Sequence, residues 1–113
     1  TLPQLAKRRW RDAASTSQRI LKIDPKSELG RTRLAFALYQ LGRYEQSRKH
    51  YALVLRDYPS KLDLRAGLGW CLVRLKRHAE AARELRAVLF AAPRHASALE
   101  GLKAAEGAVA PGR

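Results

Sequence analysis

Side chains that could act as nucleophiles, bases or metal ligands are few and lie far apart in this sequence. The chain has one cysteine, Cys71, and three histidines, His50, His78 and His95. One thiol cannot form a disulfide within the chain, and no group of cysteines and histidines has the spacing of a zinc site. We find no nucleophile–base pair, no glycine-rich phosphate loop and no paired carboxylates in a supporting context. The sequence therefore predicts no enzyme, no cofactor and no metal site.

Aromatic and basic side chains are the remaining candidates, and their chemistry is recognition. The stretch from Arg33 to Tyr44 carries Phe36, Tyr39 and Tyr44 within nine positions, and Trp70 follows Phe36 after 34 residues. Aromatic rings and arginines supply much of the free energy of protein binding because they bury large areas and donate hydrogen bonds. These rings either face a ligand or fill a core, and the elements that carry them decide which.

The spacing of the prolines reveals an internal repeat. Pro25, Pro59 and Pro93 are separated by 34 residues each, and sliding the chain by this distance aligns residues 28–61 with 62–95. The identical pairs include Leu34 with Leu68, Leu38 with Leu72, Leu41 with Leu75, Val54 with Val88 and Leu55 with Leu89. These are apolar positions at helical spacing, so the repeat is one of structure. One unit cannot bury its own apolar face, which means that the units must stack.

Each unit is expected to contain two helices joined by a short turn and ended by its proline. The predicted helices are residues 10–23, 26–41, 44–57, 60–75, 78–91 and 96–107. Gly42 can adopt the left-handed conformation that ends the first helix of a unit. Lys76 stands at the equivalent position and adopts that conformation less easily, so the second turn is expected to be tighter or strained.

The repeat resembles the tetratricopeptide repeat family, and the resemblance covers nearly the whole chain. Leu68 and Gly69 match the family's Leu-Gly pair, and Pro93 matches its terminal proline. The family's tryptophan is replaced by Arg31 and Arg65, which is a departure from the pattern. The resemblance implies an all-α fold, a right-handed α-solenoid of antiparallel helix pairs.

The resemblance also implies one domain built from consecutive units. We divide it into a half repeat at residues 1–27, repeats at 28–61 and 62–95, a capping helix at 96–110 and a tail at 111–113. The chain contains no methionine and begins at Thr1, so we expect it to be a piece of a longer protein. The half repeat lacks its partner helix, so apolar surface near Leu2 and Leu5 is expected to meet an upstream repeat or to drive self-association.

A helical wheel separates two faces of the predicted first helix. Leu34, Leu38 and Leu41 cluster on one face, and the rings of Phe36 and Tyr39 lie on the opposite one. By resemblance, first helices line a concave groove. The predicted groove comprises Leu29, Thr32, Phe36, Tyr39, Gln40, Ala66, Trp70, Val73 and Arg74, with a basic rim of Arg33, Lys61 and Arg94. The alternative, that the rings pack between repeats, stays open.

The formal net charge of +13 is the strongest compositional feature. It favours an acidic partner such as a nucleic acid, an anionic polysaccharide or an acidic protein. By unit the charge is +5 for residues 1–27, +4 for 28–61, +4 for 62–95 and zero for 96–113. A solvated surface with an arginine-rich coding bias would give the same charge, and arginine outnumbers lysine 16 to 7. That bias suggests a GC-rich bacterial source.

The function predicted from these features is that of a protein-interaction scaffold, which binds a peptide or a partner domain with acidic and apolar residues. The alternative is a polyanion, either RNA or an acidic polysaccharide, bound through the basic surface. Nucleic acid is the weaker interpretation because basic side chains are expected on both faces of the array and not in one patch. No apolar run approaches the ~18 residues of a membrane span, so we expect a soluble protein of the bacterial cytoplasm or periplasm.

Overall fold

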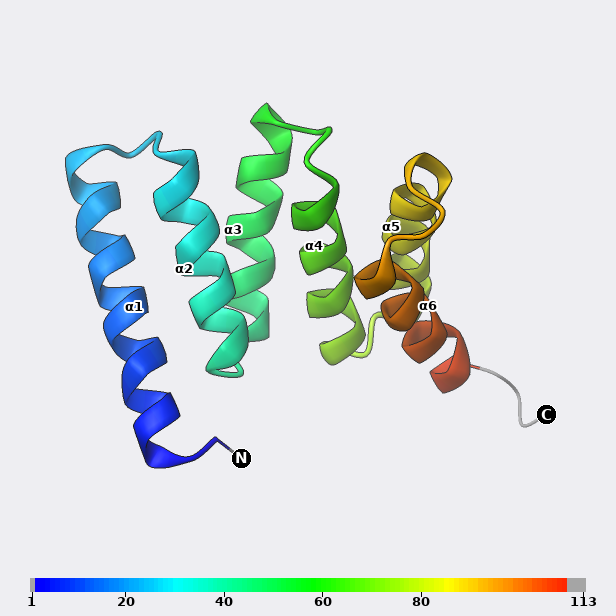
Figure 1. Cartoon of the computed structure of the whole chain (residues 1–113), viewed down its shortest axis with the longest axis horizontal. Helices are drawn as coiled ribbons and strands as arrows, with labels where there is room; N and C mark the ends of the chain where they lie inside the picture. The colour runs from blue at the N-terminus through cyan, green and yellow to red at the C-terminus, as the bar shows by residue number, and fades with distance from the viewer. Residues whose placement is uncertain (1, 110–113) are drawn as a thin grey trace.

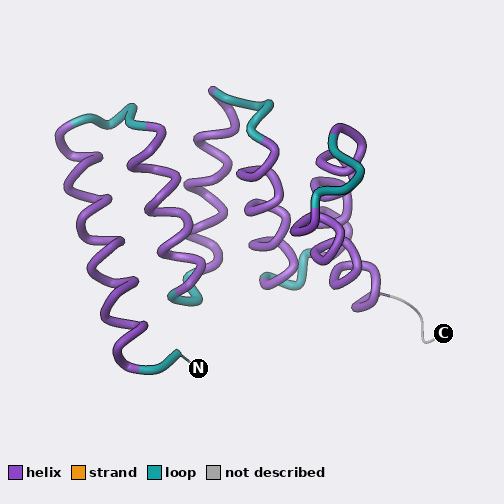
Figure 2. Tube along the Cα trace, viewed as in Figure 1, coloured by secondary structure: helices purple, strands orange, loops and turns teal. Residues whose placement is uncertain are grey.

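The computed structural model describes residues 2–109, and within them every regular element is a helix (Figure 1). The helices are α1 (Gln4–Ile23), α2 (Glu28–Gln40), α3 (Tyr44–Asp57), α4 (Leu62–Arg74), α5 (His78–Ala91) and α6 (Ala96–Val109). Consecutive helices pack against each other and alternate in direction, with short turns between them (Figure 2). This confirms the predicted all-α helical-repeat solenoid. Thr1 and residues 110–113, which include the predicted tail and the last residue of the predicted capping helix, lie outside the described residues.

Helix α1 is longer than predicted, since it begins at Gln4 and not at residue 10. Pro3 lies directly before it, and the Pro3 carbonyl accepts a hydrogen bond from the Lys7 N–H at 3.0 Å. No glycine or proline follows until Pro25, so nothing interrupts the helix on the way. At 20 residues α1 is the longest helix, yet no helix within residues 2–109 is long and apolar enough to cross a membrane.

The turns within the two repeats have the same geometry in spite of different residues. Gly42 has a φ of 79° and Lys76 a φ of 65°, so both adopt the left-handed conformation. In the second turn the Arg77 N–H donates to the Leu72 carbonyl at 2.9 Å, and the equivalent bond in the first turn is 2.8 Å. The second turn is therefore not tighter than the first. The strain lies in one residue, because a side chain at positive φ costs roughly 1–2 kcal/mol.

Small residues allow the paired helices to approach closely. A Cβ atom on Gly69 would lie 2.6 Å from the side chain of Leu85, which is fully buried. The hydroxyl of buried Ser47 donates to the Ala35 carbonyl at 2.6 Å, and the Cys71 thiol donates to that hydroxyl at 3.3 Å. Burial raises the pKa of Cys71 to about 11, so the thiol stays protonated and is a core group.

The arginines that replace the family's tryptophan join each first helix to its surroundings. Arg65 donates to Glu84 on α5 at 2.8 Å and to the Pro59 carbonyl at 3.0 Å. Arg31 makes the same two bonds one repeat earlier, to Nδ1 of His50 at 2.9 Å and to the carbonyl of the preceding proline at 3.2 Å. Each arginine thus holds a first helix, a second helix and the turn before them together, which is packing work that a tryptophan ring does by contact.

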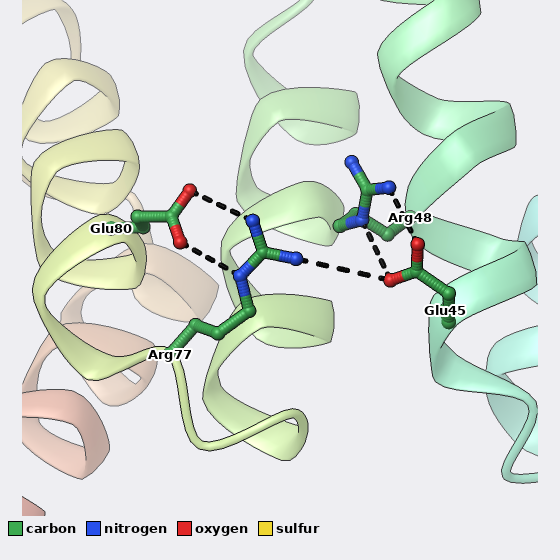
Figure 3. A network of polar contacts seen from close by, with 4 residues as sticks. All are labelled: Glu45, Arg48, Arg77 and Glu80. Atoms are coloured by element: carbon green, nitrogen blue, oxygen red, sulfur yellow. Dashed lines mark hydrogen bonds and ion pairs between the residues drawn. The ribbon is translucent and has the colours of Figure 1, made fainter.

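An ion-pair network connects the starts of α3 and α5 (Figure 3). Arg48 pairs with Glu45 at 2.7 Å, and Arg77 pairs with Glu80 at 2.7 Å. Arg77 also reaches Glu45 at 3.9 Å and so links the two pairs. The side chains are partly exposed, so salt screens these interactions and their contribution to stability is small. The ion pairs matter more for the surface charge, because each basic group in the network has an acidic neighbour that balances it.

Candidate binding groove

A groove with a volume of about 950 Å³ opens between the first helices of the two repeats and extends along one face of α1. Its walls come from α1, α2 and α4, and α6 contributes Ser97 at one side. The groove exists because α2 and α4 make little direct contact, whereas α4 packs closely on α6. Tyr51 of α3 lies between α2 and α4 and forms the floor. A Cβ atom on Gly67 would lie 2.7 Å from the Tyr51 ring, so the missing side chain makes room for this floor.

Two contacts between α2 and the region of α4 flank the groove near its ends. Lys61, which precedes α4, pairs with Glu28 at the start of α2 at 3.0 Å. At the other end, the Arg74 Nε donates to the Tyr39 hydroxyl at 3.0 Å. We call these contacts the two clasps.

Phe36 is the most exposed aromatic ring of the groove, with 47% of its surface accessible. Trp10 of α1 supports it in an edge-to-face arrangement, with 5.3 Å between ring centroids and an interplanar angle of 78°. The ring is thus held by one neighbour and presents its remaining surface to the groove. An exposed, pre-positioned ring is what a hydrophobic anchor of a ligand requires.

Arg74 lies between the aromatic residues of successive repeats. Its guanidinium carbon is 5.9 Å from the Tyr39 ring centroid and 5.8 Å from the Trp70 ring centroid, both within cation–π distance. The hydrogen bond to the Tyr39 hydroxyl raises the pKa of Arg74, so the group remains a cation. Within residues 2–109 no acidic side chain forms an ion pair with Arg74 or with Arg33, the other basic residue of the groove. Two positive charges therefore border an apolar surface.

Trp70 both lines the groove and packs between repeats. Its indole N–H donates to the Ser97 carbonyl at 3.1 Å and to the Ser97 hydroxyl at 3.0 Å, which fixes the ring against the start of α6. A Cβ atom on Gly101 of α6 would lie 3.2 Å from the Trp70 ring. Trp70 therefore combines the two interpretations of the aromatic rings, a ligand-facing ring and a ring packed between repeats. One edge of its ring is bonded to the start of α6, and the ring also lines the groove.

Five of the nine predicted groove residues and one of the three predicted rim residues lie at the groove. The residues found there are Thr32, Phe36, Tyr39, Trp70 and Arg74, together with Arg33 of the predicted rim. On α4 the groove face runs through Asp63, Gly67, Trp70 and Arg74, positions that lie one above another on a helix. The helical wheel put Ala66 and Val73 on this face beside Trp70 and Arg74, where the structure has Asp63 and Gly67.

The other predicted residues lie elsewhere, and the rotation of the helices explains why. Ala66 is 2% exposed and belongs to the core formed with α5 and α6, and Val73 packs against the same core. Leu29 is exposed beyond the groove, and Gln40 is half-buried at the end of α2. The remaining rim residues are Lys61, which is engaged by Glu28, and Arg94, which is exposed in the turn before α6.

The contribution of α1 was missed by sequence reasoning. Trp10 is absent from the predicted groove set, because that set was drawn from the first helices of the two repeats and residues 1–27 form only a half repeat. In the structure Trp10, Ala13, Ser17 and Ile20 of α1 border the groove. Their spacing of three and four residues defines one helical face and was the signal available. Tyr51 is likewise absent from the predicted groove set, although it forms the floor.

Two acidic residues also border the groove, Asp12 on α1 and, on the side near α6, Asp63 on α4. The Asp63 carboxylate accepts a hydrogen bond from His95 Nε2 at 2.7 Å. His95 Nδ1 in turn accepts from the Ala98 N–H at 3.2 Å, so His95 caps the start of α6. The acidic group near α6 is thus engaged within the chain, whereas Arg33 and Arg74 are not neutralised by an ion pair.

Comparison with known proteins gives one finding about the family. The sequence model of a family described as tetratricopeptide repeat matches residues 32–96, which is more than half of the chain. No curated protein matches the chain.

Proposed function

Since this chain belongs to the tetratricopeptide repeat family, whose repeats generally mediate interactions between proteins, we propose that its groove binds an extended segment of a partner protein. Members of the family typically act as scaffolds and not as enzymes. The observation that carries the proposal is the half-exposed ring of Phe36 inside a groove of about 950 Å³. Exposed aromatic rings in concave apolar sites are typical anchor points of protein recognition.

The partner segment would combine apolar or aromatic side chains with an acidic residue. Its apolar side chains would cover Phe36 and pack against the floor at Tyr51 and Gly67. A carboxylate would pair with Arg33 or Arg74, because planar guanidinium groups bind carboxylates through two parallel hydrogen bonds. The cations would set orientation and the rate of association, and burial of the rings would supply affinity.

Selection from a library of displayed peptides tests this proposal. We expect enriched peptides to contain an aromatic or aliphatic residue and an Asp or Glu, and Phe36→Ala to weaken their binding by about tenfold or more, as loss of a central anchor does. Phe90→Ala is the matched control, since Phe90 on α5 is 92% exposed and does not line the groove. Binding that survives Phe36→Ala, or that Phe90→Ala weakens equally, would place the partner elsewhere.

A further inference from the structure

Positive charge is concentrated on one helix. Helix α1 contains six Lys and Arg residues and one Asp, a net charge of +5, whereas each of the helices α2 to α6 has a net charge between −1 and +1. Most of the remaining net positive charge comes from residues between the helices, because the basic residues within α2 to α6 are largely balanced by acidic ones. The even division of charge by repeat unit thus conceals an uneven distribution in the structure, because a single exposed helix holds more than a third of the net charge of +13.

Five of these side chains form a continuous stripe along α1. They are Lys7, Arg8, Arg11, Arg19 and Lys22, which fall within about 120° on a helical wheel. This basic stripe lies on the other side of α1 from Trp10 and Ala13, which pack toward α2. At 1.5 Å per residue, the stripe from Lys7 to Lys22 is about 22 Å long. All five side chains are exposed.

The basic stripe is not neutralised from within the described chain. Every ion pair found in residues 2–109 joins residues outside α1. The network in Figure 3 illustrates the contrast, since Arg48 and Arg77 share two carboxylates there. The stripe has one acidic neighbour, Asp12, which lies four residues after Arg8 and forms no ion pair with it. Five cations beside one carboxylate create a local positive potential, which attracts an anionic partner over a distance of about a Debye length.

The composition of this face discriminates between kinds of partner. Gln4, Ser15 and Gln18 fill the spaces between the bases and are also exposed, so the face has no apolar or aromatic side chain. A stacked helix or a protein partner would need apolar contacts at the centre of its interface. A membrane-surface helix inserts its apolar face, but the apolar face of α1 packs on α2. The apolar residues expected at this end of the chain are exposed only beside the stripe, at Leu5 and Ile23.

We propose that the basic stripe of α1 binds the phosphate backbone of a double-stranded nucleic acid without reading its sequence. Duplex DNA carries one negative charge per ~1.7 Å of axis, so each of the five cations can meet a phosphate, and backbone contacts need no aromatic side chain. Single-stranded nucleic acids are usually held by bases stacked on aromatic rings, which this face lacks. This surface is separate from the groove, so the protein would bind its two partners independently.

Fluorescence anisotropy with labelled DNA duplexes of about 20 base pairs tests the proposal, with the salt concentration varied between about 50 and 200 mM. The complete chain should bind two unrelated sequences alike, with a dissociation constant near the micromolar range and a salt slope of about −4, the value for four to five phosphate contacts. The variant Lys7→Ala/Arg11→Ala/Lys22→Ala should bind about tenfold or more weakly at the lower salt, and its slope should fall by about 3.

The matched control removes three exposed bases from second helices, as Lys49→Ala/Arg56→Ala/Arg83→Ala. It lowers the net charge equally and should change the affinity by less than about threefold if binding is confined to the stripe. An equal loss in both variants would show that diffuse charge binds DNA and would overturn the assignment. Preference for one duplex sequence, or binding to anionic lipid vesicles without binding to DNA, would overturn it as well. Phe36→Ala should leave DNA binding unchanged, and circular dichroism verifies that each variant is folded.

Discussion

Where the first unit, residues 28–61, ends its first helix with Gly42, the second unit, residues 62–95, uses Lys76, and both residues adopt positive φ. Where Arg65 meets the carboxylate of Glu84, Arg31 meets an imidazole. The two units therefore reproduce one geometry with different chemistry. The comparison teaches that the repeat preserves backbone positions and distances, while the residues at those positions set how much each contributes to stability.

The largest expected difference between the units lies where their paired helices come closest. The first unit accommodates Ala35, but a Cβ atom on Gly69 in the second would meet fully buried Leu85 at 2.6 Å. We expect Gly69→Ala to lower the free energy of unfolding by about 1–3 kcal/mol, the cost of an extra methyl group in a packed core. Urea denaturation measures this change.

Gly107→Ala on α6 is the matched control for that substitution. A Cβ atom there has no neighbour within 4 Å, so alanine should raise the free energy of unfolding by about 0.5–1 kcal/mol through its better helix propensity. If both substitutions stabilised the protein equally, the close contact between Gly69 and Leu85 would not oppose a Cβ atom. The proposed difference between the two units at this position would then be wrong.

Exchanging the turn residues should give the second largest effect. Lys76→Gly is expected to raise the free energy of unfolding by about 0.5–1 kcal/mol, because relief of the left-handed conformation exceeds the added flexibility of glycine in the unfolded chain. Gly42→Lys in the first unit should lower it by a similar amount. Guanidinium denaturation of both variants provides the comparison, and a shift in the same direction for both would contradict the equivalence of the two turns.

The smallest expected effect concerns the imidazole that replaces a carboxylate in the first unit. Burial and, secondarily, the charge of Arg31 lower the pKa of His50 from its ordinary 6.5. The unfolded chain therefore binds this proton more readily, so the stabilising contribution is complete above about pH 6.5 and is lost as the pH falls through that value. Because His50 is only half-buried, we expect a loss of less than about 1 kcal/mol between pH 7.5 and 5.5.

His50→Glu converts the first unit to the chemistry of the second and is the direct test. A carboxylate at this position stays charged over the same pH range and should pair with Arg31 as Glu84 pairs with Arg65. Urea midpoints measured at both pH values should fall less for this variant than for the unmodified chain. An identical fall in both proteins would assign the pH dependence to other groups.

The fold could be predicted from sequence because its determinants are local and periodic. The spacing of the prolines predicted the repeat unit. The helical spacing of apolar residues predicted the buried helix face that carries Leu34 and Leu38, which are 2% and 4% exposed. The roles of Arg31 and Arg65 could not be predicted, since each depends on a partner 19 residues away that only folding brings close. The sequence shows a polar residue at an apolar position of the family pattern. It does not show the hydrogen-bond partners that this residue finds in the folded chain.

The candidate site was predicted in part for a related reason. The repeat distance identified Phe36 and Trp70, because a face repeated in two units is visible in one sequence. The wall formed by α1 is an end effect, which occurs once and leaves no repeated signal. Ala66 shows a second limit, since a wheel determines which residues share a face but not how far the helix is rotated toward its neighbours.

The two clasps decide how the opening between α2 and α4 responds to salt. The curvature of a solenoid is the sum of small rotations between successive units. At this boundary α3 packs closely on α4, whereas α2 makes few direct contacts with α4. One end of the opening is held by the pair between Lys61 and Glu28, which dissolved salt weakens. The other end is held by the contact of Arg74 with Tyr39, which is dipolar and aromatic and is less sensitive to salt. A rise in ionic strength therefore loosens one end of the groove more than the other.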